Sequence, residues 1–260
     1  MNNKKHLPAF ERLLDILDEL RVKCPWDREQ TFDSLRTLSI EEMYELSEAI
    51  VGGNFMEIKK ELGDLLLHII FYAKIADESG QFDITGVIDA LCNKLIYRHP
   101  HVFGEISMDN AGDVVKNWEQ LKIKEKDGNK TVLSGVPASL PALIKAGRIQ
   151  DKAAAVGFDW EEKEQIWDKI DEEQQELMLE IEAEDRDKIE AEFGDLFFAL
   201  INAARLYGVN PETALERTNR KFIDRFTYLE NQTIRKGRSL KSMTLEEMNE
   251  IWEEAKRKGL

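Results

Sequence analysis

The chain has few cysteines, no long apolar run and no glycine-rich phosphate loop. Its two cysteines, Cys24 and Cys92, are too few for a disulfide framework. The best apolar runs, residues 65–73 and 196–204, are about half as long as a membrane span, and no hydrophobic signal segment follows Met1. We therefore expect a reduced, cytoplasmic protein without a membrane partner, and the absence of a Walker-type loop excludes P-loop phosphate binding.

Glycine and proline are also scarce, with 15 and 6 residues among 260. Long stretches consist of Glu, Lys, Leu, Ala and Arg, which are strong helix formers, so a mostly helical chain is expected. The net charge is −15, and residues 161–195 hold 16 acids against 4 bases, whereas residues 196–260 hold 12 bases against 9 acids. An acidic helix pair of this kind would repel a nucleic-acid backbone, so cations and phosphates are the expected ligands and nucleic acid is not.

One acidic pattern occurs twice at a fixed spacing. Glu42, Glu45, Glu61 and Asp64 recur as Glu173, Glu176, Glu192 and Asp195, each 131 residues further along the chain. The neighbouring sequence repeats as well: residues 61–73 are ELGDLLLHIIFYA and residues 192–204 are EFGDLFFALINAA. A period of about 130 residues is too long for a solenoid unit and fits a whole domain. We expect an all-α tandem repeat of two helical-bundle domains, residues 1–126 and 142–260, with a turn-rich linker at 127–141.

The spacing of the acids predicts a metal site on paired helices. Residues three apart lie on one helix face, so Glu173 and Glu176 project together, and Glu192 and Asp195 do the same on the next helix. A short polar reversal at residues 183–187 lets the two helical arms run antiparallel, which brings the four carboxylates to one place. An all-oxygen ligand set of this kind suits Mg²⁺, with Mn²⁺ as a substitute.

A simpler explanation exists for single acids in this pattern. Acids three apart on a helix are usually a solvated face, and Ser39 stands three residues before Glu42, as in a capping box that starts a helix. Residue 170 is isoleucine, so capping does not explain Glu173. The joint recurrence of four acids next to apolar runs favours the metal site, because unpaired carboxylates at the edge of a core are costly.

The same patterns predict the helices. We expect paired arms at residues 40–51 with 58–76 and at 166–183 with 188–206, and closing helices at 211–231 and 245–257. Asn210 before a proline and Thr244 three residues before a glutamate are helix-start signals. Gly63 and Gly194 lie inside apolar helices at a cost of about 1 kcal/mol relative to alanine, which predicts close packing by a neighbouring helix.

Cations and aromatic residues also recur. Lys94, Arg98, Trp118 and Lys122 of the first copy correspond to Lys221, Arg225, Trp252 and Lys256 of the second. A lysine and an arginine four residues apart present two charges on one helix face, and a tryptophan beside a lysine offers a stacking surface next to a charge. Together with a metal, these groups suit a nucleoside polyphosphate.

On these residues the chain resembles the MazG nucleoside triphosphate pyrophosphohydrolases of the all-α NTP pyrophosphatase superfamily. The resemblance covers nearly the whole chain and includes CPWDREQTF at 24–32, RHPHVF at 98–103, VGFDW at 156–160 and the repeated WExxK. It implies a dimeric enzyme, broad in base, that cleaves NTPs with Mg²⁺ into NMP and pyrophosphate. It also implies that the four acids of the pattern bind the metal and that nearby Lys, Arg and Trp hold the nucleotide.

Differences between the copies predict which one is catalytic. Lys169 and Lys188 each stand four residues before an acid of the second copy, where they can reach a phosphate, and the matching residues of the first copy are Leu38 and Glu57. We therefore expect catalysis in the second domain. The first, which keeps its four acids as a possible second metal site, is expected to serve assembly or regulation. The sequence leaves open which glutamate is the general base.

Two other kinds of protein fit this pattern less well. A ferritin-like di-iron protein needs Glu-x-x-His motifs, and the second copy contains no histidine. His99 and His101 alone, without cysteine or glutamate at ligand spacing, are a weak transition-metal signal. A helical interaction module would explain the repeat but not the acids, and an absence of metal-dependent nucleotide turnover would favour it.

Overall fold

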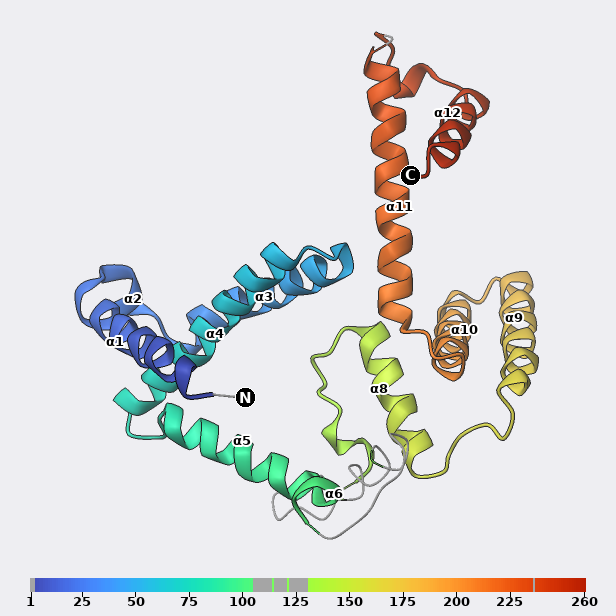
Figure 1. The fold of residues 1–260 in the computed structure, drawn as a ribbon. Helices are drawn as coiled ribbons and strands as arrows, with labels where there is room; N and C mark the ends of the chain where they lie inside the picture. Colours follow the sequence, from blue (N-terminus) through green and yellow to red (C-terminus); the bar gives the residue numbers. More distant parts are fainter. Residues whose placement is uncertain (1–2, 105–113, 115–120, 122–130, 236) are drawn as a thin grey trace. The chain divides into compact units, whose positions relative to one another are not determined.

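The computed structural model describes residues 3–104, 114, 121, 131–235 and 237–260. These residues form helices and turns and no strand (Figure 1), which confirms the all-α class. The chain divides into two compact units, Met1–Ser107 and Met108–Leu260. The domain boundary expected at residue 126 lies outside the described residues, as do residues 127–130 of the predicted linker. None of the described helices is both long enough and apolar enough to cross a membrane.

The first unit is built around one antiparallel helix pair. Its elements are η1 (Asn3–His6), α1 (Leu7–Lys23), α2 (Pro25–Glu29), α3 (Phe32–Gly52), α4 (Phe55–Glu78), α5 (Ile84–Arg98) and α6 (Pro100–Phe103). Helices α3 and α4 are the predicted arms, and α1 packs against them. Leu17, Leu35, Ile70 and Phe71 are buried where these three helices meet. The acids of the first copy therefore lie on arms whose base is anchored in a core.

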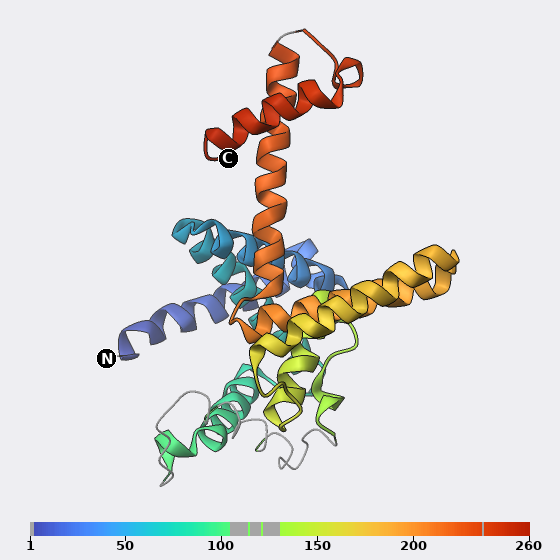
Figure 2. The same ribbon diagram turned by 90° about the vertical axis from the view of Figure 1, so that its right-hand side faces the viewer.

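The second unit repeats the arm pair and adds a long helix. Its elements are η2 (Leu133–Gly135), α8 (Ala142–Ala155), η3 (Lys163–Gln165), α9 (Ile166–Ala183), α10 (Arg186–Leu206), α11 (Pro211–Arg235), η4 (Leu240–Ser242) and α12 (Leu245–Arg257). Figure 2 shows α9 and α10 running side by side along their length. Ile166, Ile170, Ala199 and Ala203 form the core at the base of this pair.

Helix boundaries follow their capping residues. Helix α3 begins at Phe32 and not at residue 40, because Thr31 and Ser34 exchange side-chain-to-backbone hydrogen bonds of 2.9 and 3.1 Å. Ser39 lies inside α3, so its suggested role as the start of a helix before Glu42 is wrong. The start signal at Thr244 is confirmed by its reciprocal bonds with Glu247, and Asn210 caps α11 through the N–H of Thr213.

The same turn joins the arms in both units. Gly53 and Glu184 occupy matching positions with φ of 66° and 55°, in the left-handed region. The next residues, Asn54 and Asp185, cap the second arm by accepting backbone N–H groups at its start. This turn reverses the chain within two residues, and it explains how acids on successive helices come to face one another.

The expectation for the two helical glycines is wrong. A Cβ atom placed on Gly63 or Gly194 would meet nothing within 4 Å. No helix in the described part of the chain packs closely against either residue, so close packing within one chain does not explain them.

Candidate metal centre and nucleotide site

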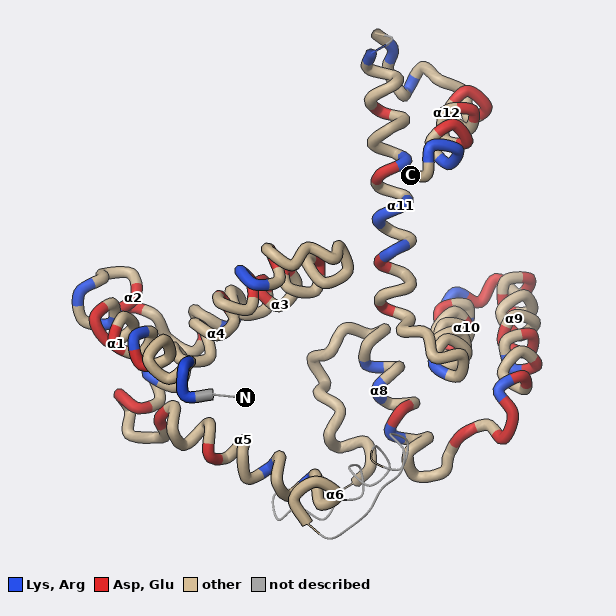
Figure 3. The backbone as a smooth tube through the Cα atoms, in the orientation of Figure 1, with Lys and Arg blue, Asp and Glu red and all other residues tan. Residues whose placement is uncertain are grey.

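Three of the four predicted acids of the second copy come together between α9 and α10. Glu173, Glu176 and Glu192 each place one oxygen within 4.8 Å of the others. Glu173 is buried, Glu192 is half-buried and Glu176 is exposed. Buried Ile170 and Leu177 lie on the adjoining face of α9, so the acids line the edge of the core, and Figure 3 shows acidic residues gathered along α9.

Electrostatics make this acid group unfavourable without a cation. Burial raises the pKa of Glu192, and the charges of Glu176, Asp195, Glu173 and Glu180 raise it further. One oxygen of Glu192, Oε2, is buried and has no hydrogen-bond partner. Asp195, the fourth predicted acid, contributes to the field on Glu192 but is not among the three acids whose oxygens converge. A divalent cation would satisfy the orphaned oxygen and remove the repulsion, so the residues fit such an ion.

The two predicted phosphate-binding lysines border this group, and both are already engaged. Lys169 Nζ lies 2.7 Å from Glu173 Oε1 and 2.9 Å from Glu172 Oε1, and the hydrogen bonds to these acids raise the pKa of Lys169. Lys188 Nζ lies 3.4 Å from Glu180 on α9 and 3.7 Å from Asp185. The lysines therefore stand at either end of the acid group as ion-pair partners.

Sequence reasoning missed Glu180, which holds Lys188 against the neighbouring helix. Its position was readable, because it stands four residues after Glu176 and so shares the acid face of α9. The first copy has Ala49 at the matching place and Glu57 in place of Lys188. Both members of this ion pair therefore belong to the second copy alone.

The remaining predicted nucleotide contacts form a separate cluster on α11 and α12. The rings of Phe222 and Trp252 lie 5.0 Å apart, and the Arg225 guanidinium lies 5.8 Å from the centre of the Trp252 ring. Arg225 Nε also donates to the main-chain oxygen of Leu260. Figure 1 shows α12 folded back beside the part of α11 that leads away from α10.

Lys221 and Lys256 lie on these two helices, and Lys256 pairs with Glu253. Among the described residues, no hydrogen bond, ion pair or ring contact joins this cluster to the acids. The structure thus places the predicted metal ligands with Lys169 and Lys188, and the predicted stacking surface with its own cations, at two separate positions.

The first copy assembles a similar acid group. Glu42, Glu45 and Glu61 each place an oxygen within 4.8 Å of the others. The Glu61 side chain is 4% exposed, and its Oε2 is buried without a hydrogen-bond partner. Burial raises the pKa of Glu42, and so do the charges of Asp64 and Glu45 and a hydrogen bond shared with Glu61.

A lysine that sequence reasoning overlooked pairs with two acids of this first group. Lys60 Nζ lies 2.9 Å from Glu61 Oε1 and 3.9 Å from Glu45 Oε2. The matching residue of the second copy is Ala191. The predicted stacking residues of the first copy, Trp118 and Lys122, lie outside the described residues.

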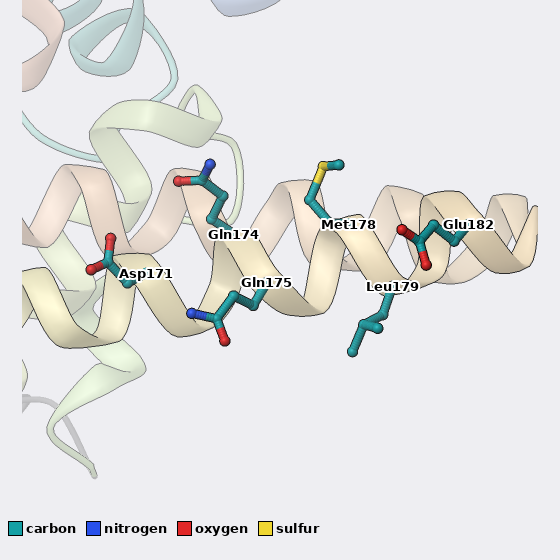
Figure 4. A pocket seen from close by; sticks show the side chains of 6 residues that line it. All are labelled: Asp171, Gln174, Gln175, Met178, Leu179 and Glu182. Carbon is teal, nitrogen blue, oxygen red and sulfur yellow. The ribbon is translucent and has the colours of Figure 1, made fainter.

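A hollow of about 480 Å³ lies on the opposite face of α9 from the acid group. Figure 4 shows its six lining side chains, all of them from α9. They are Asp171, Gln174, Gln175, Met178, Leu179 and Glu182. With 100° between successive helical residues, these positions point away from Glu173 and Glu176. The hollow is therefore not part of the acid site, although it leaves apolar side chains of an arm uncovered.

A known protein family matches each of the two copies. The family described as the MazG nucleotide pyrophosphohydrolase domain matches the chain twice, at residues 30–103 and 161–229, and the two matches contain the two acid groups. The tandem all-α repeat is thereby confirmed.

Three relatives align with nearly all of this chain. The nucleoside triphosphate pyrophosphohydrolase/pyrophosphatase MazG of Thermotoga maritima is 45% identical over 250 residues, which cover 95% of each chain. The nucleoside triphosphate pyrophosphohydrolase of Escherichia coli K12 is 41% identical over 258 residues, covering 96% of this chain and 98% of the relative. The uncharacterized protein YabN of Bacillus subtilis is 45% identical over 251 residues, which cover 95% of this chain and 51% of YabN.

Proposed function

Because the chain belongs to the MazG nucleotide pyrophosphohydrolase family, we propose that helices α9 and α10 form an active site that hydrolyses nucleoside triphosphates to NMP and pyrophosphate with Mg²⁺. The observation that carries the proposal is the convergence of Glu173, Glu176 and Glu192 within 4.8 Å, with an unpartnered buried oxygen on Glu192. Mn²⁺, which takes similar oxygen ligands, is expected to substitute.

The chain's own residues would divide the work. When bound, the divalent cation supplies Lewis-acid polarisation of phosphate oxygens. Glu173, Glu176 and Glu192 would hold it, and one carboxylate of the group would take the proton of the water that attacks the α–β phosphoanhydride in line. The bridging bond breaks and pyrophosphate leaves with the bonding electrons. Lys169 and Lys188 would contact the phosphates and stabilise the charge that grows on the leaving group.

Product analysis tests this reaction. Purified protein should convert NTPs to NMP and pyrophosphate with Mg²⁺ or Mn²⁺, and EDTA should stop turnover. A panel of ribo- and deoxynucleoside triphosphates should show activity across bases, because no described side chain of the acid group is placed to read a base edge. Release of orthophosphate, or turnover that resists EDTA, would contradict the proposal.

The proposal includes a homodimer that completes the site. Among the described residues of one chain, no hydrogen bond, ion pair or ring contact joins the cluster of Arg225 and Trp252 to the acids. The arms also expose large apolar side chains such as Met178, Leu179 and Phe197. A second copy would cover such surface and bring its own cations to the phosphates. Sedimentation should therefore report a dimer.

Mixing two inactive variants tests that arrangement. If one copy supplies the acids and the other the cations, Glu173→Ala mixed with Arg225→Ala should regain part of the activity by subunit exchange. A monomer with full activity would contradict the dimer, and a dimer without rescue would mean that each chain completes its own site.

A further inference from the structure

The Lys169 ammonium occupies a place beside Glu173, a candidate metal ligand. It is 2.7 Å from Oε1 of Glu173, the most buried acid of the second group, whose side chain is 8% exposed. The second partner of Lys169, Glu172, is 55% exposed and is not among the converging acids. Lys169 thus joins an interior candidate ligand to an exterior carboxylate on the same helix.

In the first copy a different lysine contacts the most buried acid. There the most buried acid, Glu61, is 4% exposed and is neutralised by Lys60 from the second arm. Leu38 occupies the place of Lys169, and Ala191 of the second copy occupies the place of Lys60. Each acid group therefore has a lysine ammonium on its most buried carboxylate, contributed by a different arm. The two carboxylates stand at different positions of the repeat, since Glu61 matches Glu192 and Glu173 matches Glu42, so what the groups share is an ammonium on whichever acid is most buried.

A divalent cation on Glu173 Oε1 would compete with the Lys169 ammonium that now lies 2.7 Å from this oxygen. Mg²⁺ binds oxygen at about 2.1 Å, so an ion on Glu173 Oε1 would lie within a few ångströms of Lys169 Nζ and repel it strongly in this partly buried place. The lysine stem has four flexible carbons, its side chain is 36% exposed, and Glu172 remains as a partner. Displacement from Glu173 therefore leaves Lys169 at the edge of the site.

We propose that Lys169 is a displaceable counterion of Glu173: a divalent cation takes its place, and the displaced ammonium then binds the triphosphate. This inference rests on the proposed function, because it needs the second acid group to bind metal. The exchange sets an order of binding: the metal binds first, and only then is Lys169 free to contact a phosphate.

Metal binding without nucleotide tests the exchange. Mn²⁺ affinity is measured by electron paramagnetic resonance in the full chain carrying Glu45→Gln and Glu61→Gln, so that the second group alone binds. Lys169→Met, which keeps the stem and resembles Leu38 of the first copy, should raise Mn²⁺ affinity by about tenfold, the size of one lost charge-assisted hydrogen bond. The matched control, Lys188→Met, removes the same charge from a lysine that pairs with Glu180 and Asp185, and should change affinity by less than about threefold.

A second measurement follows the displaced lysine. With Mn²⁺ bound, Lys169→Met should weaken binding of an α,β-methylene triphosphate analogue, and without metal it should have no effect. Equal shifts of Mn²⁺ affinity in Lys169→Met and Lys188→Met, or lower affinity in Lys169→Met, would overturn the exchange while leaving the proposed function intact. Loss of analogue binding in Lys169→Met without metal would overturn the binding order. If the parent protein binds no Mn²⁺, the proposed function fails first.

Discussion

The two arm pairs share a backbone and differ in the charges beside it. Both reverse through a left-handed residue, Gly53 or Glu184, followed by a capping Asn or Asp. Both bring three glutamates within 4.8 Å. The second pair adds Lys188 and its partner Glu180, whereas the first has Glu57 and Ala49 there. The two acid groups are therefore alike, and the charges beside them are what differs between the copies.

The interiors of the two pairs differ as well. In the first, Ser39 Oγ lies 3.2 Å from His68 Nδ1 and 2.8 Å from the Tyr72 hydroxyl. The second copy places Ile170, Ala199 and Ala203 at the matching positions, as part of its apolar core. The first pair thus carries a partly buried polar network around His68, and the second has apolar residues at the matching positions. Such networks raise the cost of any change that leaves a member unpaired.

The largest expected difference between the copies is the loss of turnover when an acid is removed. Glu173→Ala should lower turnover by about 1,000-fold or more, because it removes a ligand that acts with the others as a unit. The combined change Glu42→Ala and Glu45→Ala should leave most activity. Steady-state kinetics with circular dichroism as a folding control checks both proteins. The opposite result, with activity lost only in the first-copy variant, would make the first domain the enzyme.

Replacing Lys188 by the residue found at the matching position of the first copy should have the next largest effect, on the KM for NTPs. Lys188→Glu introduces the charge of Glu57 and places it against Glu180 and Asp185. We expect KM for NTPs to rise by about 30-fold; the effect is limited because the Lys188 side chain is 60% exposed and solvent screens the repulsion. Lys188→Gln is the control that removes the charge alone and should have a smaller effect. An unchanged KM in Lys188→Glu would show that this position does not face the phosphates.

The buried histidine should make the stability of the first unit depend on pH. Burial lowers the pKa of His68 below 6.5, although the charge of Asp64 opposes this. The unfolded chain then binds more protons than the folded one, so stability is present above pH 6.5 and is lost as the pH falls toward the folded pKa. Hydrogen exchange, which reports each unit separately, should show this loss in the first unit, and His68→Gln should remove it. A loss of stability toward low pH that survives in His68→Gln would assign the effect to groups other than His68, and Glu42 is not one of them, because its raised pKa gives a dependence of the opposite sign.

Much of this architecture was readable from the sequence. Helices 166–183 and 245–257 begin and end as predicted, because their apolar spacing and capping residues agree. The acids were found because a repeat holds them in register on helix faces. The start of α3 was missed because its cap, Thr31 with Ser34, lacks the acidic partner that marks a capping box.

The ion pairs were harder to foresee. A lysine four residues before a glutamate predicts a contact along the helix as well as a reach toward phosphate, and the structure has the contact between Lys169 and Glu173. Lys60 is adjacent to Glu61 in sequence, where side chains do not normally face each other, and its long stem makes the contact. The separation of the Trp252 cluster from the acids depends on the direction of α11 after residue 210, which no local pattern specifies.

The smallest expected effect concerns the turn that the copies share. Glu184 is the one non-glycine residue with positive φ among the described residues, and a Cβ atom in the left-handed region costs about 1 kcal/mol. Glu184→Gly gives the second copy the residue that the first copy has at this position, Gly53. It should therefore stabilise the second unit by up to about 1 kcal/mol, after the added flexibility of the unfolded chain is subtracted. Glu184→Ala keeps the Cβ and removes the charge, so it separates backbone strain from repulsion within the acidic turn. Thermal unfolding of the three proteins decides between them: equal stabilisation by Ala and Gly would assign the effect to charge, and no gain in either would mean that the turn carries no strain that glycine relieves.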